Sequence, residues 1–282
     1  MHAERTRVAV VGHVEWVQFA HVQHVPVAGE VVHAEDPFEE PAGGGGVAAV
    51  QLARLAGGAR LFTALGRDEH GERSFGRLAE LGVSVHAERL DQPSRRAVTL
   101  IDVAGERTIT TLGLRLEPHG DSAELDWQSL AGLDGVYFTA GDLPALQAAR
   151  AASRVLVASP RAGEALGRGV PLDALVLSGD DAIEGGEVGR ARDDAAMLVI
   201  TDGARGGRFI AADGERGDWQ AEPLPGPARD AYGCGDSFAA GLTFGLARGM
   251  DRPSALRLAA RCGATCRAGR GPYGRQLSAE DL

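Results

Sequence analysis

Segments with strand and helix patterns alternate along the second half of this chain, and this alternation limits its fold more than any other feature. Short apolar runs that predict buried strands lie at residues 136–139, 155–158, 174–177 and 197–201. Helical patterns lie between them at residues 143–153 and 183–192. A strand, a helix and a second strand in succession usually form a βαβ unit with parallel strands. The sequence therefore predicts an α/β fold with a mostly parallel central sheet.

The two ends of the chain add elements of the same kinds. Val8–Val11 is a β-branched run that predicts a buried strand ending at Gly12. A strand is expected at 60–64, and helices are expected at 47–55, after a glycine loop, and at 71–81. Two more helices are expected at 234–248 and 252–267, because Gly249 and Pro253 stand where a helix stop and a helix start belong.

Two segments do not fit the alternation, and we expect them to form a small β lid. Residues near 13–40 are poorly periodic, and residues near 95–112 contain two β-rich stretches separated by a turn at 103–106. No linker or repeat divides the chain, so residues 1–282 are predicted to form one domain that includes the lid.

Charge and composition exclude several classes of function. The formal net charge is −10, which disfavours nucleic-acid binding, and no apolar stretch approaches the about 20 residues that span a membrane. All 29 basic residues are Arg, which excludes a P-loop lysine and a Schiff-base lysine within this chain. The three cysteines contain no CxxC pair, which argues against a zinc site. We expect a cytoplasmic protein that acts on small molecules.

The densest chemical signal is the segment 230–238, which leads directly into the expected C-terminal helix pair. Gly233 and Gly235 allow backbone N–H groups to turn toward one point, and the helix that starts there adds its positive end. Such an arrangement suits a transferring phosphoryl group. Asp236, in the first turn, could accept a proton from a hydroxyl beside that anion hole. The same residues are also compatible with a helix whose Asp only satisfies the helix dipole.

The segment resembles the C-terminal signature of the ribokinase/PfkB family of carbohydrate and nucleoside kinases, commonly D-T-x-G-A-G-D-x-F. The matching residues are Asp230, Gly233, Gly235, Asp236 and Phe238. Other family landmarks follow in order over almost the whole chain, at residues 43–55, 65–71, 105–108 and 201–207. The resemblance implies a ribokinase-like three-layer α/β/α domain with a β lid, and with these further matches it favours the catalytic reading of Asp236.

The resemblance also implies ATP, Mg²⁺ and transfer of the γ-phosphoryl group to a hydroxyl of a sugar or sugar-like metabolite. Asp236 would be the general base, and the backbone of Gly233, Cys234, Gly235 and Asp236 would form the anion hole. The residues implied beside the nucleotide are Thr201, Gly203 and Gly206, with Cys262 and Cys266 near the adenine. Family members often bind a monovalent cation near the anion hole, and many form homodimers through the lid.

The substrate side departs from the family pattern. Gly43 and Gly44 match the glycine signature, but Val47 stands where the family has a substrate-binding Asn, and Val17 where it has an Asp. Glu15, His13 or Asp36 could take over the lost contacts; otherwise the substrate is not a plain sugar. The family's Mg²⁺-organising N-x-x-E appears as residues 178–181, so Asp181 would hold the hydrated metal.

Two alternatives remain at this stage. Arg96 lies near where relatives that act on sugar phosphates place a phosphate-binding Arg, so a phosphofructokinase-like enzyme is one alternative, although Arg95 and Arg96 could equally be a solvated pair on the lid edge. The other alternative is a catalytically silent protein that binds a nucleotide or sugar as a sensor, which the changes at Val17, Val47 and Ser178 favour.

Overall fold

A mostly parallel sheet runs through the centre of the computed structural model, which describes residues 5–180, 189 and 191–282. Within these residues the sheet has nine strands in the order β13-β12-β11-β10-β9-β8-β1-β4-β5. Seven of them, from β11 to β5, are parallel, and β12 and β13 continue the edge in antiparallel pairing. The strands are β1 Val8–Val11, β4 Ala59–Gly66, β5 Val83–Leu90, β8 Leu133–Phe138, β9 Ser153–Ala158, β10 Ala174–Ser178, β11 Met197–Thr201, β12 Gly207–Ala211 and β13 Arg216–Trp219.

Strand β1 is the point at which the order of the sheet reverses. It pairs with β4 on one side, where Ala9 faces Arg60, and with β8 on the other, where Ala9 faces Val136. The chain therefore builds the sheet outward first in one direction and then in the other. In open α/β sheets, ligands bind beyond the carboxyl ends of the strands at such a reversal. This places the expected site just after Val11.

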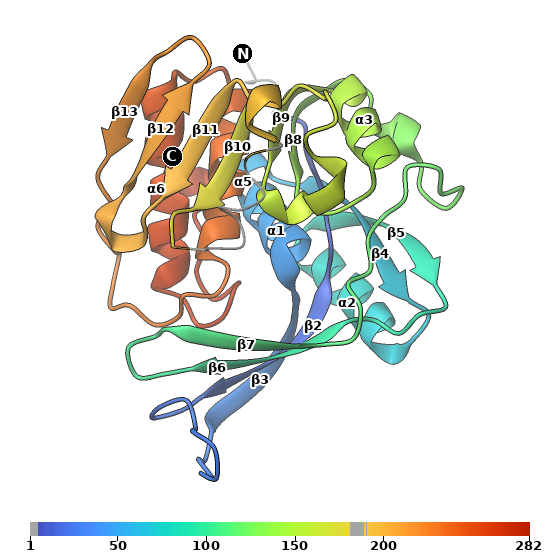
Figure 1. Cartoon of the computed structure of the whole chain (residues 1–282). Coiled ribbons are helices and arrows are strands. Elements are labelled where there is room, and N and C mark those ends of the chain that lie inside the picture. Colours follow the sequence, from blue (N-terminus) through green and yellow to red (C-terminus); the bar gives the residue numbers. More distant parts are fainter. Residues whose placement is uncertain (1–4, 181–188, 190) are drawn as a thin grey trace.

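Helices cover both faces of the sheet and give the predicted three layers (Figure 1). One face carries α1 Gly43–Ala56, α2 Glu69–Glu80, α5 Cys234–Ala247 and α6 Arg252–Arg267, and the other carries α3 Leu143–Ala152. The alternation of side chains along β1 serves both layers: Val8 and Val10 enter the core under α1 and α5, and Ala9 and Val11 enter the core on the α3 side.

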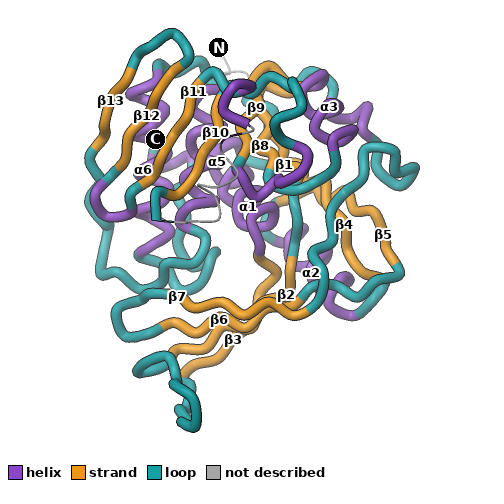
Figure 2. Tube along the Cα trace, in the orientation of Figure 1, coloured by secondary structure: helices purple, strands orange, loops and turns teal. Residues whose placement is uncertain are grey.

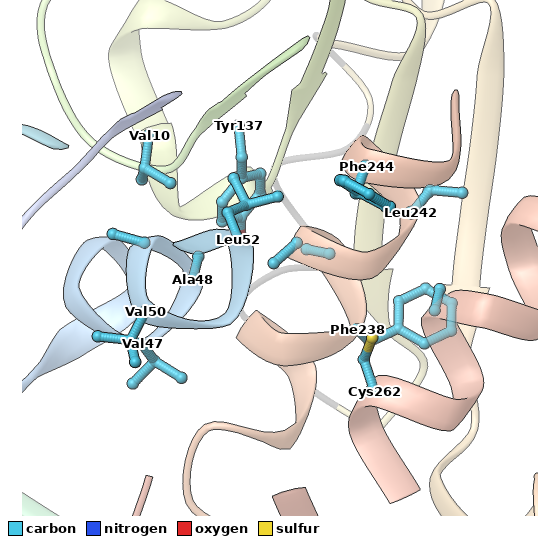
Figure 3. Packing of buried hydrophobic residues seen from close by; sticks show 14 of the residues in the cluster. Val10, Val47, Ala48, Val50, Leu52, Tyr137, Phe238, Leu242, Phe244 and Cys262 are labelled. Carbon is cyan, nitrogen blue, oxygen red and sulfur yellow. The ribbon is translucent and has the colours of Figure 1, made fainter. Parts of the chain in front are cut away.

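The core under α1 and α5 fixes the two helices beside each other. Figure 3 shows Leu52 of α1 close to Tyr137 of β8, with Leu242 and Phe244 of α5 in the same layer. Leu52 and Leu242 are fully buried. Burial of each such side chain stabilises the fold by about 1.5–3 kcal/mol. The starts of these two helices are therefore held in a defined relation at the carboxyl edge of the sheet.

A second, four-stranded sheet in the order β3-β2-β6-β7 lies below that edge (Figures 1 and 2). Its strands are β2 Glu15–His21, β3 Glu35–Ala42, β6 Arg96–Ile101 and β7 Arg107–Leu112. They come from the two segments expected to form a lid. The turn before β7 reaches the main layer, because Arg267 of α6 donates to the carbonyl of Ala104 at 3.0 Å and Ala231 N–H donates to that of Gly105 at 3.0 Å.

One expectation for the N-terminal half was wrong. The four glycines 43–46 do not form a loop before α1 but are its first turn. A Cβ atom at Gly45 would lie 2.7 Å from the carbonyl carbon of Gly12 and 2.7 Å from the carbonyl oxygen of His13. Glycine here lets the helix start pack directly on the end of β1. The helix expected at 183–192 lies mostly outside the described residues. Among the residues that the structure describes, no helix is long and apolar enough to cross a membrane.

Candidate active site

The start of α5 presents an open helix end at the carboxyl edge of the sheet. Gly233 is its N-cap in the left-handed region, with φ 78° and ψ 0°. Ser237 N–H donates to the Gly233 carbonyl at 2.9 Å. The N–H groups before Ser237 belong to the first turn, and a first turn has no preceding helical carbonyl to accept their hydrogen bonds. Gly235 is exposed, and no atom lies within 4 Å of where its Cβ would be. This geometry leaves room for an anion at the positive end of the helix.

Asp236 faces the start of the other core helix. A Cβ atom built on Gly44, in the first turn of α1, would lie 3.0 Å from Asp236 Oδ1 and 3.0 Å from Thr139 Oγ1. The carboxylate therefore lies beside the end of β8, close to the beginnings of both α1 and α5, and is partly exposed. The structure thus brings together the predicted base, the predicted anion hole and Gly44 of the glycine signature.

A buried polar network closes the start of α1. The hydroxyl of Tyr232 accepts from Gly43 N–H at 3.2 Å and donates to Glu15 Oε1 at 3.4 Å. The other oxygen of Glu15 lies 3.3 Å from Arg95 Nε. Burial raises the pKa of the Glu15 carboxyl group, while the charge of Arg95 and the Tyr232 hydrogen bond lower it. Glu15, expected to contact substrate, is therefore committed to contacts within the protein.

His13, at the carboxyl end of β1, packs against the first residue of α1. Only 6% of it is exposed, and its Nε2 would lie 3.0 Å from a Cβ on Gly43. The pKa of His13 is lowered to about 3, chiefly by burial and then by the positive charges of Arg115, Arg95 and Arg161 in that order. The imidazole is therefore neutral near pH 7.

The predicted nucleotide loop forms at the ends of two neighbouring strands. Thr201 ends β11, and the 3-10 turn Gly203–Arg205 follows it, with Gly203 at φ 51° and Gly206 at φ 91°. Gly179 N–H donates to the Thr201 carbonyl at 2.8 Å, so the end of β10 joins the same edge. Asp181, the predicted metal ligand that follows β10, lies outside the described residues.

The two cysteines expected near the adenine have no exposed surface. Cys262 and Cys266 are fully buried; Cys266 Sγ donates to the Tyr232 carbonyl at 3.4 Å, and a Cβ on Gly241 would lie 2.7 Å from Cys262 Sγ. Both side chains therefore pack inward toward α5. Arg261 and Thr265 of α6 instead line a cavity of about 310 Å³.

The substrate-side residues divide into buried and exposed groups. Val17 and Val47 are fully buried core residues, and Val47 Cγ1 would lie 2.8 Å from a Cβ on Gly233. Neither side chain therefore lines an open cleft. Arg96 is exposed on the lid, and the neighbouring Arg95 makes the inward contact with Glu15. Sequence reasoning missed the roles of Arg95 and Tyr232, because these contacts join residues that are far apart in the chain.

The parallel sheet with its strand-order reversal, the lid and the glycine-bounded helix starts are features of the ribokinase-like fold. The chain belongs to the pfkB family of carbohydrate kinases, whose family model matches residues 5–162 and 184–277. Proteins of this family transfer a phosphoryl group to an alcohol acceptor. Among the described residues, no three His, Cys, Asp or Glu side chains are grouped so that they could hold a metal ion.

Several known proteins are similar to this chain. A fructokinase from Klebsiella pneumoniae is 29% identical over 82% of this chain and 87% of its own length. The bifunctional protein HldE of Azotobacter vinelandii is 28% identical over 91% of this chain, but the match covers only 59% of HldE. The Arabidopsis thaliana ribokinase, solved with ribose and ATP, matches 98% of this chain and 97% of its own with a TM-score of 0.74 and 17% identity. The structural match supports the fold alone.

Proposed function

We propose that this carbohydrate kinase transfers the γ-phosphoryl group of ATP to a hydroxyl of a sugar, with Asp236 as the general base. One observation carries the proposal. Asp236 lies in the first turn of α5, one residue after the exposed Gly235, and its carboxylate faces the start of α1. A proton acceptor and an open helix end are thus adjacent, which is the arrangement that phosphoryl transfer to a hydroxyl requires.

The reaction follows from these positions. The acceptor hydroxyl donates its proton to the Asp236 carboxylate as its oxygen attacks the γ-phosphorus. The bond from that phosphorus to the β–γ bridging oxygen breaks, which gives a phosphate ester and ADP. The backbone N–H groups of Cys234 and Gly235 stabilise the charge on the moving phosphoryl group. Asp236 then releases its proton to solvent.

Nucleotide and cation contacts extend the proposal. The loop with Thr201, Gly203 and Gly206 would lie beside the nucleotide, and Arg261 and Thr265 are the side chains of α6 that could touch the base. Bound Mg²⁺ would neutralise charge on the phosphates, and Asp181 would hold it through water. A monovalent cation would lie near Asp230, a buried carboxylate that accepts from the N–H groups of Tyr232 and Gly271.

The test is ADP release with ATP and Mg²⁺ over a panel of sugars, sugar phosphates and nucleosides. The proposal predicts acceptor-dependent ADP release, with one phosphate ester formed for each ADP. Binding of ATP and of an acceptor without any transfer would contradict it and would favour the silent sensor. That second reading draws on Val17 and Val47, which place apolar groups where the family has hydrogen-bonding ones.

A further inference from the structure

A cavity of about 280 Å³ lies at the amino edge of the main sheet, the edge that holds the amino ends of its parallel strands. Its buried lining residues are Val8, Ala59 and Leu133, which are the first residues of β1, β4 and β8. The lid and the proposed transfer site lie at the opposite edge, beyond the carboxyl ends of these strands (Figure 1). The cavity is therefore a separate place in the fold.

Three arginines, Arg5, Arg7 and Arg60, line the same cavity. Among the residues that the structure describes, none of the three forms an ion pair with a carboxylate. An arginine elsewhere in the protein does so, because Arg77 lies 2.9 Å from Glu40. The chain has a formal net charge of −10, so carboxylates are plentiful. Three guanidinium groups that line a cavity without a carboxylate partner favour an anionic ligand.

Backbone carbonyls fix two of the three guanidinium groups. Arg5 Nε donates to the carbonyl of Ala56, the last residue of α1, at 2.8 Å, and Arg5 Nη2 would lie 2.5 Å from a Cβ on Gly58. Arg60 Nη1 donates to the Ser129 carbonyl. A guanidinium group has five N–H donors, so one carbonyl does not exhaust it. Both side chains are thus held in place and keep donors for a ligand.

Arg7 is held through its backbone. Its N–H donates to Asp134 Oδ2 at 2.8 Å, and its carbonyl accepts from Asp134 N–H at 2.8 Å. Its guanidinium nitrogens Nη1 and Nη2 would each lie 3.5 Å from a Cβ on Gly132, just before β8. Asp134 brings one carboxylate to this edge, and Arg154 lies 3.9 Å from its other oxygen. The charge at the amino edge therefore remains positive.

The size and lining of the cavity narrow the class of ligand. Its volume lies near the lower end of the range of about 300–1,000 Å³ that ligand pockets occupy, so it suits a small molecule. The apolar first residues of the strands would contact a carbon skeleton, and the arginines would bind a charged group. A phosphate ester carries a charge of about −1.5 to −2 at pH 7 and three acceptor oxygens. Guanidinium groups match these oxygens with paired N–H donors.

We propose that this cavity binds a small phosphate ester, with Arg5, Arg7 and Arg60 donating to its phosphate group. The site does not overlap the proposed transfer site. Helix α1 runs between the two, with Gly43 at one end and Ala56 at the other, and its 14 residues span about 20 Å. This inference goes beyond the proposed function and does not rest on it.

The test is calorimetric binding of glycerol 3-phosphate and of glycerol, with Mg²⁺ and a non-hydrolysable ATP analogue present to occupy the proposed transfer site. Glycerol 3-phosphate should bind more than about 10-fold more tightly than glycerol, because hydrogen bonds to charged groups contribute about 1.5–3 kcal/mol. Citrate is the third probe, since it is a small multiply charged anion without phosphorus. Tighter binding of citrate than of glycerol 3-phosphate would overturn the assignment of a phosphate ester.

Variants locate the bound phosphate. Arg5→Ala and Arg7→Ala should each weaken binding of glycerol 3-phosphate by roughly 10- to 100-fold. Both residues are exposed, so the fold should persist, and an unchanged affinity for the ATP analogue would demonstrate it. Arg257→Ala is the matched control, because Arg257 is an exposed arginine of α6 that does not line the cavity; binding should change by less than about 2-fold.

Gly235→Asp, measured without the ATP analogue, separates the two sites. It places a carboxylate at the open end of α5 and should leave binding of glycerol 3-phosphate at the amino edge unchanged. Loss of binding in this variant, with none in Arg5→Ala and Arg7→Ala, would move the phosphate to the transfer site and overturn the proposal. Equal affinity for glycerol 3-phosphate and glycerol would also overturn it. So would an equal loss in Arg5→Ala, Arg7→Ala and Arg257→Ala, which would show a general effect of surface charge.

Discussion

The starts of α1 and α5 both contain a left-handed glycine but have opposite surroundings. Each helix begins beside a left-handed glycine, Gly43 at φ 79° and Gly233 at φ 78°, and neither has a side-chain cap. At α1, other groups of the protein accept hydrogen bonds from the backbone amides: Gly43 N–H donates to the Tyr232 hydroxyl, and Gly45 N–H donates to the His13 carbonyl. At α5, Gly235 is exposed, with open space beside it.

The difference teaches that a glycine-rich helix start is not in itself a ligand site. Both ends have the same partial positive charge, but packing decides whether protein groups or a ligand will satisfy the amides. The closed end of α1 positions Asp236 and the network around Glu15. The open end of α5 is where we propose that a phosphoryl group binds. The predictions that follow test this division.

The largest effect is expected when the open end is given a negative charge. Gly235→Asp should reduce ATP-dependent turnover by at least about 100-fold, because a carboxylate would occupy the space proposed for the phosphoryl group. The thermal midpoint should stay within a few degrees, since the new Cβ meets no atom and an acidic residue in the first turn is favourable by about 0.3–1 kcal/mol. Gly235→Ser is the uncharged comparison variant, and its turnover should fall less than that of Gly235→Asp. Near-normal turnover by Gly235→Asp would mean that the end of α5 binds no phosphate.

The next effect concerns the contact between the two helix starts. In Gly44→Ala the new methyl group would lie 3.0 Å from Asp236 Oδ1, so the carboxylate must shift. A misplaced base should lower kcat by roughly 10- to 100-fold while nucleotide affinity changes little. Gly46→Ala, in the same turn but directed toward Tyr273, is the matched control and should retain kcat. Steady-state kinetics on both variants checks this. Equal kcat values for Gly44→Ala and Gly46→Ala would show that the contact between Gly44 and Asp236 does not affect catalysis.

The smallest effect tests whether the end of α1 is closed. The pKa of His13 is lowered from 6.5 to about 3 in the folded protein, so below pH 6.5 the unfolded chain binds a proton that the folded protein does not. The stability that neutral His13 contributes is therefore present above pH 6.5 and lost as the pH falls toward 3. The loss should approach about 1.4 kcal/mol per pH unit.

Urea unfolding between pH 7 and pH 4 measures this slope in the unmodified protein and in His13→Gln, which cannot take up the proton. The free energy of unfolding should fall more steeply with decreasing pH in the unmodified protein than in the variant. Parallel curves for the two proteins would show that His13 is solvated, and the end of α1 would then be open like that of α5.

Local signals account for the part of the fold that the sequence predicts well. The bounds of β1 and α6 agree with expectation, because β1 is an uninterrupted apolar run rich in Val and α6 has Asp251 as an N-cap followed by Pro253. The strands β5, β12 and β13 were not predicted. They lie at or near the two edges of the sheet and contain exposed polar residues or glycine, which hide the apolar pattern of a strand.

The candidate site likewise has one part that local sequence signals predict and another part that they do not. The helix start at Gly233 and Asp236 is contiguous in sequence, so its chemistry can be inferred from local rules. The choice between Arg95 and Arg96 cannot, because alternation along a strand places them on opposite faces without saying which face is inward. The network of Tyr232 and Glu15 joins residues 217 positions apart and needs the folded chain. The first turn of α1 was missed because glycine disfavours helices, and close packing on Gly12 overrides that preference.

The most direct test of the account compares turnover and nucleotide affinity in Asp236→Asn, which keeps the shape of the side chain but is too weak a base to take the proton. We predict that kcat falls by about 10²- to 10⁴-fold while the Kd for ATP changes little, because only general-base catalysis is lost. A variant that turns over its acceptor at a near-normal rate would show that Asp236 does not accept the hydroxyl proton.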